Sequence, residues 1–143
     1  MKGQKRMRLY HLVHEAGVHA NGRITRKAGA PLRSDTFVKL GTTADYVVPC
    51  GEGEKPFGIS QNDCDNPQEI LTVCTVNAQG TKLLRVEAAC SAGAELVTAA
   101  DGKAKPLPSA AGTYWVCARA LNDGAADGLV ECETFYPVKT VVA

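Results

Sequence analysis

The stretch "ELVTAADGKAKPLPSAAGTYWVCARALND", residues 95–123, contains the signals that decide the fold. An apolar pair is followed by a turn, a short strand with a proline, a Gly-containing loop and a strand that ends in Asn-Asp. A looser version with the same order of parts, "TFVKLGTTADYVVPCGEGEKPFGISQND", occupies residues 36–63. The likeness extends into "EILTVCT" at 69–75 and "GLVECET" at 128–134. We therefore expect two units of four short strands with internal pseudo-symmetry.

Short apolar runs, separated about every eight to twelve residues by Gly, Pro, Asn or Asp, indicate an all-β fold, a small barrel or sandwich. Strands are predicted at 36–40, 46–49, 57–61, 70–76, 82–89, 95–99, 103–107, 114–121 and 129–135. Asp101-Gly102 predicts a hairpin, because a tight type I′ turn needs positive φ at both central positions. Pro49, Pro106 and Pro108 should lie at strand ends or edges, since proline cannot donate to the ladder.

Length and composition are those of one globular domain. The chain has 143 residues, of which 45% are hydrophobic and 22% charged. No window approaches the roughly 18 apolar residues of a membrane span, so no membrane partner is expected. The start, "MKGQKRMRLYHLVHEAG", lacks the apolar core of a secretory signal, so export by that route is not expected either.

Charge is distributed unevenly along the chain. Up to Ser34 there are eight basic residues and one acidic residue, whereas the remainder has eight basic and fourteen acidic residues. This asymmetry predicts a basic N-terminal arm over residues 1–35, followed by an acidic β-domain over 36–143. Such an arm could dock on an acidic surface of a protein or a nucleic acid, or it could be a solvated extension.

Six cysteines are the first candidates for chemistry. No C-x-x-C pair occurs, which argues against a zinc ribbon or a thioredoxin-type motif. Two interpretations stay open: buried thiols that pack as small hydrophobic groups, or disulfides formed within or between chains outside the cytosol. The residues are Cys50, Cys64, Cys74, Cys90, Cys117 and Cys132.

Motifs for catalysis are missing from the sequence. The three histidines, His11, His14 and His19, all fall in the basic arm, where a rigid triad or metal site is not expected. No nucleophile elbow, P-loop or H-E-x-x-H string occurs, and "GEGEKPFG" is interpreted as a surface loop. Tyr114-Trp115 is expected in a core or interface. We expect neither enzymatic activity nor a cofactor or metal.

With these strands assigned, the second unit resembles the C-terminal part of small capsid-decoration, or cement, proteins of tailed bacteriophages and prophages. The matching positions are Gly93, Asp101-Gly102-Lys103, Ala118-Arg119-Ala120-Leu121, Ala126-Asp127-Gly128 and Leu129-Val130. Upstream, "FVKLGT" and "KPFGIS" fit the opening part of the same pattern, so the resemblance covers about residues 36–135. The chain departs from the pattern at Cys117, in its number of cysteines and in its longer basic leader.

The resemblance implies an all-β domain, usually a homotrimer, on the outer surface of the expanded capsid. There it would bridge neighbouring major capsid subunits and stabilise the shell, with no direct nucleic-acid contact. The protein would be made in the cytoplasm of the host bacterium. The basic arm is then the expected docking element, through Lys5, Arg6, Arg8, Tyr10, Arg23, Arg26 and Lys27.

Other classes stay open at the level of sequence. One is another virion part, such as a tail or head-fibre component. Another is a disulfide-stapled β-module that binds a glycan or a protein. A third is a barrel that binds nucleic acid through its basic arm, for which the affinity would fall steeply with salt.

Overall fold

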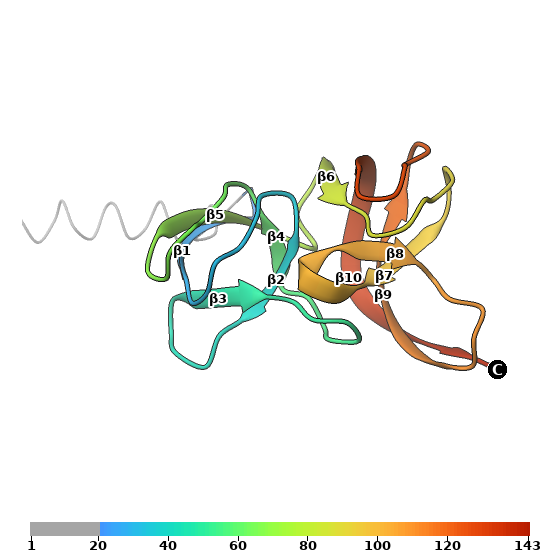
Figure 1. Ribbon diagram of the computed structural model, residues 1–143, viewed down its shortest axis with the longest axis horizontal. Helices are drawn as coiled ribbons and strands as arrows, with labels where there is room; N and C mark the ends of the chain where they lie inside the picture. Colours follow the sequence, from blue (N-terminus) through green and yellow to red (C-terminus); the bar gives the residue numbers. More distant parts are fainter. Residues whose placement is uncertain (1–20) are drawn as a thin grey trace, which may run out of the picture.

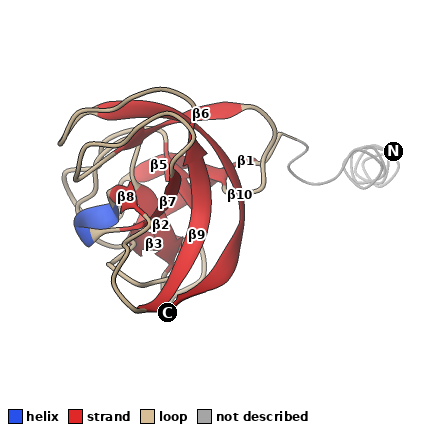
Figure 2. Ribbon diagram, turned by 90° about the vertical axis from the view of Figure 1, so that its right-hand side faces the viewer, coloured by secondary structure: helices blue, strands red, loops and turns tan. Residues whose placement is uncertain are grey.

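The protein, seen as a computed structural model, has an all-β fold with two side-by-side units, and the structure describes residues 21–143 (Figures 1 and 2). The first unit contains β1 (Arg23–Ala28), β2 (Phe37–Leu40), β3 (Tyr46–Pro49), β4 (Gly58–Ser60) and β5 (Ile70–Thr75). The second contains β6 (Thr81–Arg85), β7 (Glu95–Thr98), β8 (Ala104–Pro106), β9 (Gly112–Ala120) and β10 (Leu129–Val142). Within the described residues, no helix is long and apolar enough to cross a membrane.

The two units repeat one topology. The first is a closed barrel in the order β1-β3-β2-β4-β5, in which β1 pairs in parallel with β3 and antiparallel with β5. The second sheet has the order β6-β10-β9-β7-β8, which is the same cyclic order with every number raised by five. Its ends meet at one parallel bridge, Val86 to Ala104, where the first unit has its parallel β1–β3 pair. The all-β fold with an internal pseudo-repeat is confirmed.

The first strand, β1, lies inside the segment predicted to be a basic arm. Ile24 and Ala28 are buried, as is Leu32 just beyond the strand. Within residues 21–143, β-structure is therefore present already from Arg23, and each unit has five strands where the sequence predicted four. The signal was weak because β1, with the sequence RITRKA, has only two apolar residues, and the Thr, Arg and Lys between them are also typical of a solvated extension.

The nine predicted strands all occur. Their ends differ by a few residues, and the largest difference is in β10, which continues to Val142 instead of ending at 135. Pro49 and Pro106 each end a strand, as predicted. The predicted hairpin joins β7 to β8, with positive φ at both Asp101 and Gly102 inside the short 3-10 turn η1 (Ala100–Gly102).

One core passes through both units. Phe37 and Ile59 of the first unit pack in the same buried cluster as Leu84, Leu96 and other residues of the second. A smaller cluster fills the first barrel, with Val38, Val47, Leu71 and Val73 among its members. Because the larger cluster belongs to neither unit alone, the two units form one folded body.

The β7–β8 turn also contacts the first barrel. The amide of Gly102 donates a hydrogen bond to the carbonyl oxygen of Cys50 at 2.8 Å. The backbone comes so close that a Cβ at Gly102 would lie 2.6 Å from the carbonyl oxygen of Phe37. Two features therefore require glycine at position 102: its φ of +76° and this close approach of the backbone.

We expect Gly102→Ala to lower the free energy of unfolding by about 3 kcal/mol, because backbone strain adds to a clash that the Phe37 carbonyl cannot avoid. Urea denaturation followed by tryptophan fluorescence measures the loss. Gly53→Ala is the matched control: its φ is +78°, but no atom lies within 4 Å of the added carbon. It should cost only about 1 kcal/mol. Equal losses in the two variants would contradict the proposed contact.

Candidate interaction surface

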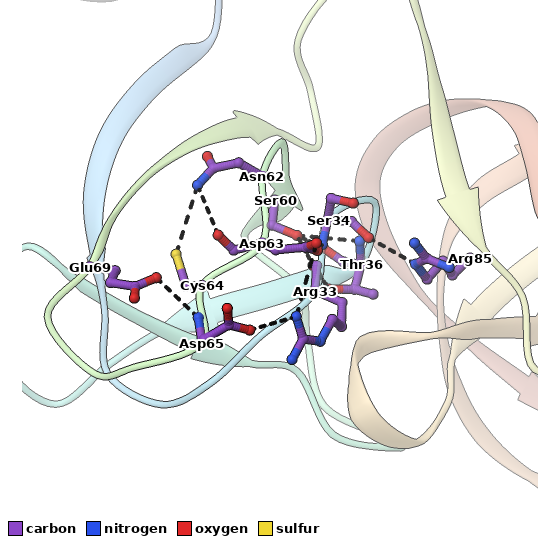
Figure 3. A network of polar contacts seen from close by, with 10 residues as sticks. All are labelled: Arg33, Ser34, Thr36, Ser60, Asn62, Asp63, Cys64, Asp65, Glu69 and Arg85. Atoms are coloured by element: carbon purple, nitrogen blue, oxygen red, sulfur yellow. Dashed lines mark hydrogen bonds and ion pairs between the residues drawn. The ribbon is translucent and has the colours of Figure 1, made fainter.

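The Asn-Asp pair that follows β4 ties three segments of the first unit together; Figure 3 labels the pair and Ser34. The Asn62 side-chain oxygen accepts a hydrogen bond from the Thr72 amide in β5 at 2.9 Å. The Asp63 carboxylate accepts one from the Ser34 amide, in the loop after β1, at 2.8 Å. We call this arrangement the Asn-Asp clasp. It joins the loop after β1 and the middle of β5 to the segment that follows β4.

The second unit repeats the clasp at equivalent positions. The Asn122 side-chain oxygen accepts a hydrogen bond from the Glu131 amide in β10 at 3.1 Å. The Asp123 carboxylate accepts one from the Ala92 amide, after β6, at 2.9 Å. The two Asn-Asp dipeptides thus accept equivalent backbone hydrogen bonds in both units.

Polar contacts beside the first clasp link it to the second unit. Arg33 forms an ion pair with Asp65 at 2.9 Å and lies 3.9 Å from Asp63. From β6, Arg85 donates through its Nε to the Ser34 carbonyl oxygen at 3.1 Å and through its backbone amide to the Asp35 carbonyl oxygen at 2.8 Å. The loop after β1 is thereby held from both units.

Electrostatics favour the ionised form of Asp63. The hydrogen bond from the Ser34 amide, helped by the nearby positive charge of Arg33, lowers the pKa of this carboxyl below its ordinary value. The pKa of Glu54 is likewise lowered, mainly by its contact with the Lys39 ammonium and also by a hydrogen bond from the Gly51 amide. Both carboxylates therefore stabilise the fold in the ionised state.

The residues predicted to form the docking arm are divided by the structure. Lys5, Arg6, Arg8 and Tyr10, together with His11, His14 and His19, lie outside the described residues. Arg23, Arg26 and Lys27 belong to β1, where Arg23 and Lys27 are exposed and Arg26, paired with buried Leu71, is half-buried. The Lys27 ammonium lies 5.9 Å from the centre of the Tyr46 ring. These three residues are thus part of a rigid strand.

All six cysteines are free thiols with buried positions. Burial raises the pKa of both Cys50 and Cys132 to about 12, and it raises the pKa of Cys117 further still. The pKa of Cys64 is also raised, first by desolvation and then by nearby carboxylates. In the described chain no group of three or more His, Cys, Asp or Glu side chains has a metal-binding arrangement.

A cleft lies where the first barrel meets the middle of β10. Its volume is about 440 Å³, within the range of ligand sites in proteins. Apolar side chains, including Leu40, Phe57 and Tyr136, line it together with Lys39 and Lys55. No carboxylate occurs among its described lining residues. The cleft is therefore apolar and positively charged.

Lys55 connects the two units at this cleft. Its ammonium lies 5.4 Å from the centre of the Trp115 ring in β9 and 5.8 Å from that of the Tyr136 ring in β10. The ion pairs between described residues use other cations, whereas Lys55 interacts with the faces of two aromatic rings. Its charge is therefore held at the surface without a neutralising carboxylate.

Beyond the cleft, β9 and β10 continue as a two-stranded ribbon. We define the ribbon as Gly112–Trp115 paired with Lys139–Val142. The register shifts between Thr134 and Val138, so that the extra residues form a bulge that contains Tyr136 and Pro137. The ribbon runs to the end marked C in Figures 1 and 2. It carries Val141, exposed to 73%, and Val138 at its base, exposed to 55%.

By its fold, the protein is an all-β protein built from two consecutive units that share one five-stranded topology. No protein-family model matches the chain, and no curated protein matches it in sequence. Among solved structures it is similar to the head fiber gp8.5 N base of bacteriophage phi29. The TM-score is 0.62 at 16% identity, over 82% of this chain and 98% of that chain. This likeness shows that the two proteins share a fold.

Sequence reasoning missed Lys55 and Tyr136. Lys55 lies in "GEGEKPFG", which looked like an ordinary surface loop, and Tyr136 follows the predicted end of the last strand. The two residues lie about eighty positions apart in the chain, and they come together only through the packing of the two units, which no local pattern encodes. The one available signal was "FYPVKTVV" at 135–142, an apolar, nearly uncharged segment beyond the repeat.

We expect acid to destabilise the protein partly through Asp63. Its lowered pKa contributes stability above the ordinary value of about 3.9, and this contribution is lost as the pH falls through the folded value. Asp63→Asn keeps an acceptor for the Ser34 amide but removes the charge, so stability should fall less steeply below about pH 4. Urea midpoints from pH 7 to pH 2.5 measure the slope. The comparison variant is Glu95→Gln, which removes one charge from the exposed first residue of β7.

The thiols should resist modification in the native state. At pH 8 a thiol with a pKa of about 12 is ionised in only about one molecule in ten thousand, and burial also blocks access. Reaction with a chromogenic aromatic disulfide should therefore be slow until denaturant releases six thiols. Rapid native reaction at several sites would contradict the burial. Fewer than six thiols after denaturation would reveal disulfides.

Proposed function

We propose that this chain is a structural protein of a bacteriophage virion that attaches to the outer surface of the head. The shared fold with a head fiber base, over nearly all of that chain, is the observation that carries the proposal. The independent resemblance of residues 36–135 to capsid-decoration proteins supports it, because both comparisons lead to the phage head. The proposed role is to decorate the expanded capsid and to stabilise it by bridging neighbouring major capsid subunits.

The molecular features suit a role based on contact area. The described residues form one rigid body with a shared core and with exposed, chemically distinct faces. We propose a homotrimer, in which several weak contacts per copy add up through effective concentration. The proposal involves no catalytic step, no cofactor, no membrane and no direct contact with nucleic acid.

A second candidate is the base of a head fiber. The similarity to the head fiber gp8.5 N base of phage phi29 favours it, since that protein is the base of such a fiber. A base would attach to the head in the same way but would hold a distal part rather than reinforce the shell. The two candidates differ in their effect on capsid stability.

Co-sedimentation of the purified protein with expanded capsids stripped of it tests attachment. We expect saturable binding at a fixed ratio to coat subunits, with little binding to unexpanded capsids or to DNA at physiological salt. Light scattering should give the mass of a trimer. Binding to DNA that weakens steeply with salt, without capsid binding, would favour the nucleic-acid alternative.

Heating the same capsids with and without the bound protein separates decoration from fiber attachment. A decoration protein should raise the temperature at which the shells disrupt, because its contacts must be broken before neighbouring coat subunits separate. Binding that leaves this temperature unchanged would favour the fiber-base role.

A further inference from the structure

Comparison of the two units identifies the part of the chain that the repeated fold does not need. In the first unit β4 begins at Gly58 and β5 ends at Thr75, and this suffices to close a barrel. In the second unit the equivalent strands β9 and β10 extend well beyond the repeat, through the ribbon of Gly112–Trp115 and Lys139–Val142. The ribbon has no counterpart in the first unit, so the topology itself does not explain it.

Both backbone edges of the ribbon are open within the described structure, although the Trp115 side chain contacts Lys55 of the first unit. The pairing of β10 with β6 stops at Glu133, and the pairing of β9 with β7 begins only at Val116. Beyond these points each strand pairs only with the other, so both outer edges offer unpaired backbone groups. Val138 and Val141 alternate on opposite faces, and both are exposed. An isolated two-stranded ribbon is marginal in water, and a third strand would stabilise it.

The charge of this region is opposite to that of the rest of the described chain. Residues 21–143 contain twelve basic and fourteen acidic residues. Between 134 and 142, however, the single charged residue is Lys139, and Gly112–Trp115 has none. The adjoining cleft adds Lys39 and Lys55, although Lys39 is paired with Glu54. Ribbon and cleft thus form one apolar strip whose uncompensated charges are positive.

We propose that this strip binds an extended segment of the coat protein that carries carboxylates among apolar side chains. The backbone of the segment adds to an open edge of the ribbon, as in other cases of strand addition. Its apolar side chains cover Val138 and Val141, and its carboxylates lie near Lys139 and Lys55. This inference rests on the proposed attachment to the capsid and names the surface and the ligand chemistry.

A second copy of the chain fits the strip less well. Ribbon-to-ribbon pairing would bring Lys139 and Lys55 of both copies to one interface, with no carboxylate from either ribbon to balance them. Like charges brought together across paired strands are destabilising. An acidic segment from another protein removes this penalty and also accounts for the absence of carboxylates in the described lining of the cleft.

The test compares capsid binding by ribbon variants with binding by a matched control. Val138→Asp combined with Val141→Asp should weaken binding to stripped, expanded capsids by about tenfold or more, because it removes apolar contact and repels carboxylates. Lys139→Glu reverses one exposed charge and should weaken binding with less risk to folding. The control is Ile70→Asp in β5, which is exposed to 66% on the first barrel and should bind as the wild type does.

The outcomes separate this inference from the proposed function. If the wild-type protein itself does not bind capsids, the proposed function fails. If the wild type and the folded Lys139→Glu and double variants all bind equally, the function stands and the strip is not its docking surface. Conversion of the ribbon variants from trimer to monomer by light scattering would assign the strip to contact between copies and overturn the inference. Circular dichroism and thermal unfolding establish that each variant is folded.

Discussion

The structure depends on the junction between the two repeated units. The loop after β1 accepts hydrogen bonds from the Arg85 side chain and backbone, and the amide of Gly102 donates to Cys50 across the same boundary. These contacts position Phe37 and Ile59 in a core that both units share. Without the junction each unit would expose part of its own apolar surface, and the cleft between barrel and β10 would not exist.

The two units resemble each other more in the hydrogen bonds made by their Asn-Asp pairs than in the residues that fill their cores. The Asn-Asp clasp and the antiparallel bridge that accompanies it occur in both units, through Leu32 and Cys64 in one and Cys90 and Gly124 in the other. The clasps give backbone amides hydrogen-bond partners at equivalent positions in the two units. Differences between the units therefore stand out as additions, and the ribbon is the largest of them.

Local patterns were sufficient to predict strands whose alternation and turns are complete within a few residues, such as Glu95–Thr98 with its Asp-Gly turn. They were insufficient for β1, where outward Arg and Lys masked a half-buried strand, and for the end of β10, where an apolar tail continued the strand beyond the repeat. The candidate surface was the least predictable part. Lys55, Trp115 and Tyr136 come from three segments, and they meet only after the two units pack.

Each unit is continuous in sequence, and this determines the order in which the chain can fold during synthesis. The closing pair β1–β5 is available once Thr75 has left the ribosome, before any of the second unit has emerged. The early barrel can bury Val47 and Leu71 in its own interior, but Phe37 and Ile59 await partners from the second unit. In the nascent chain these two apolar residues stay exposed on the first barrel. The second unit then folds by packing its own apolar residues against them.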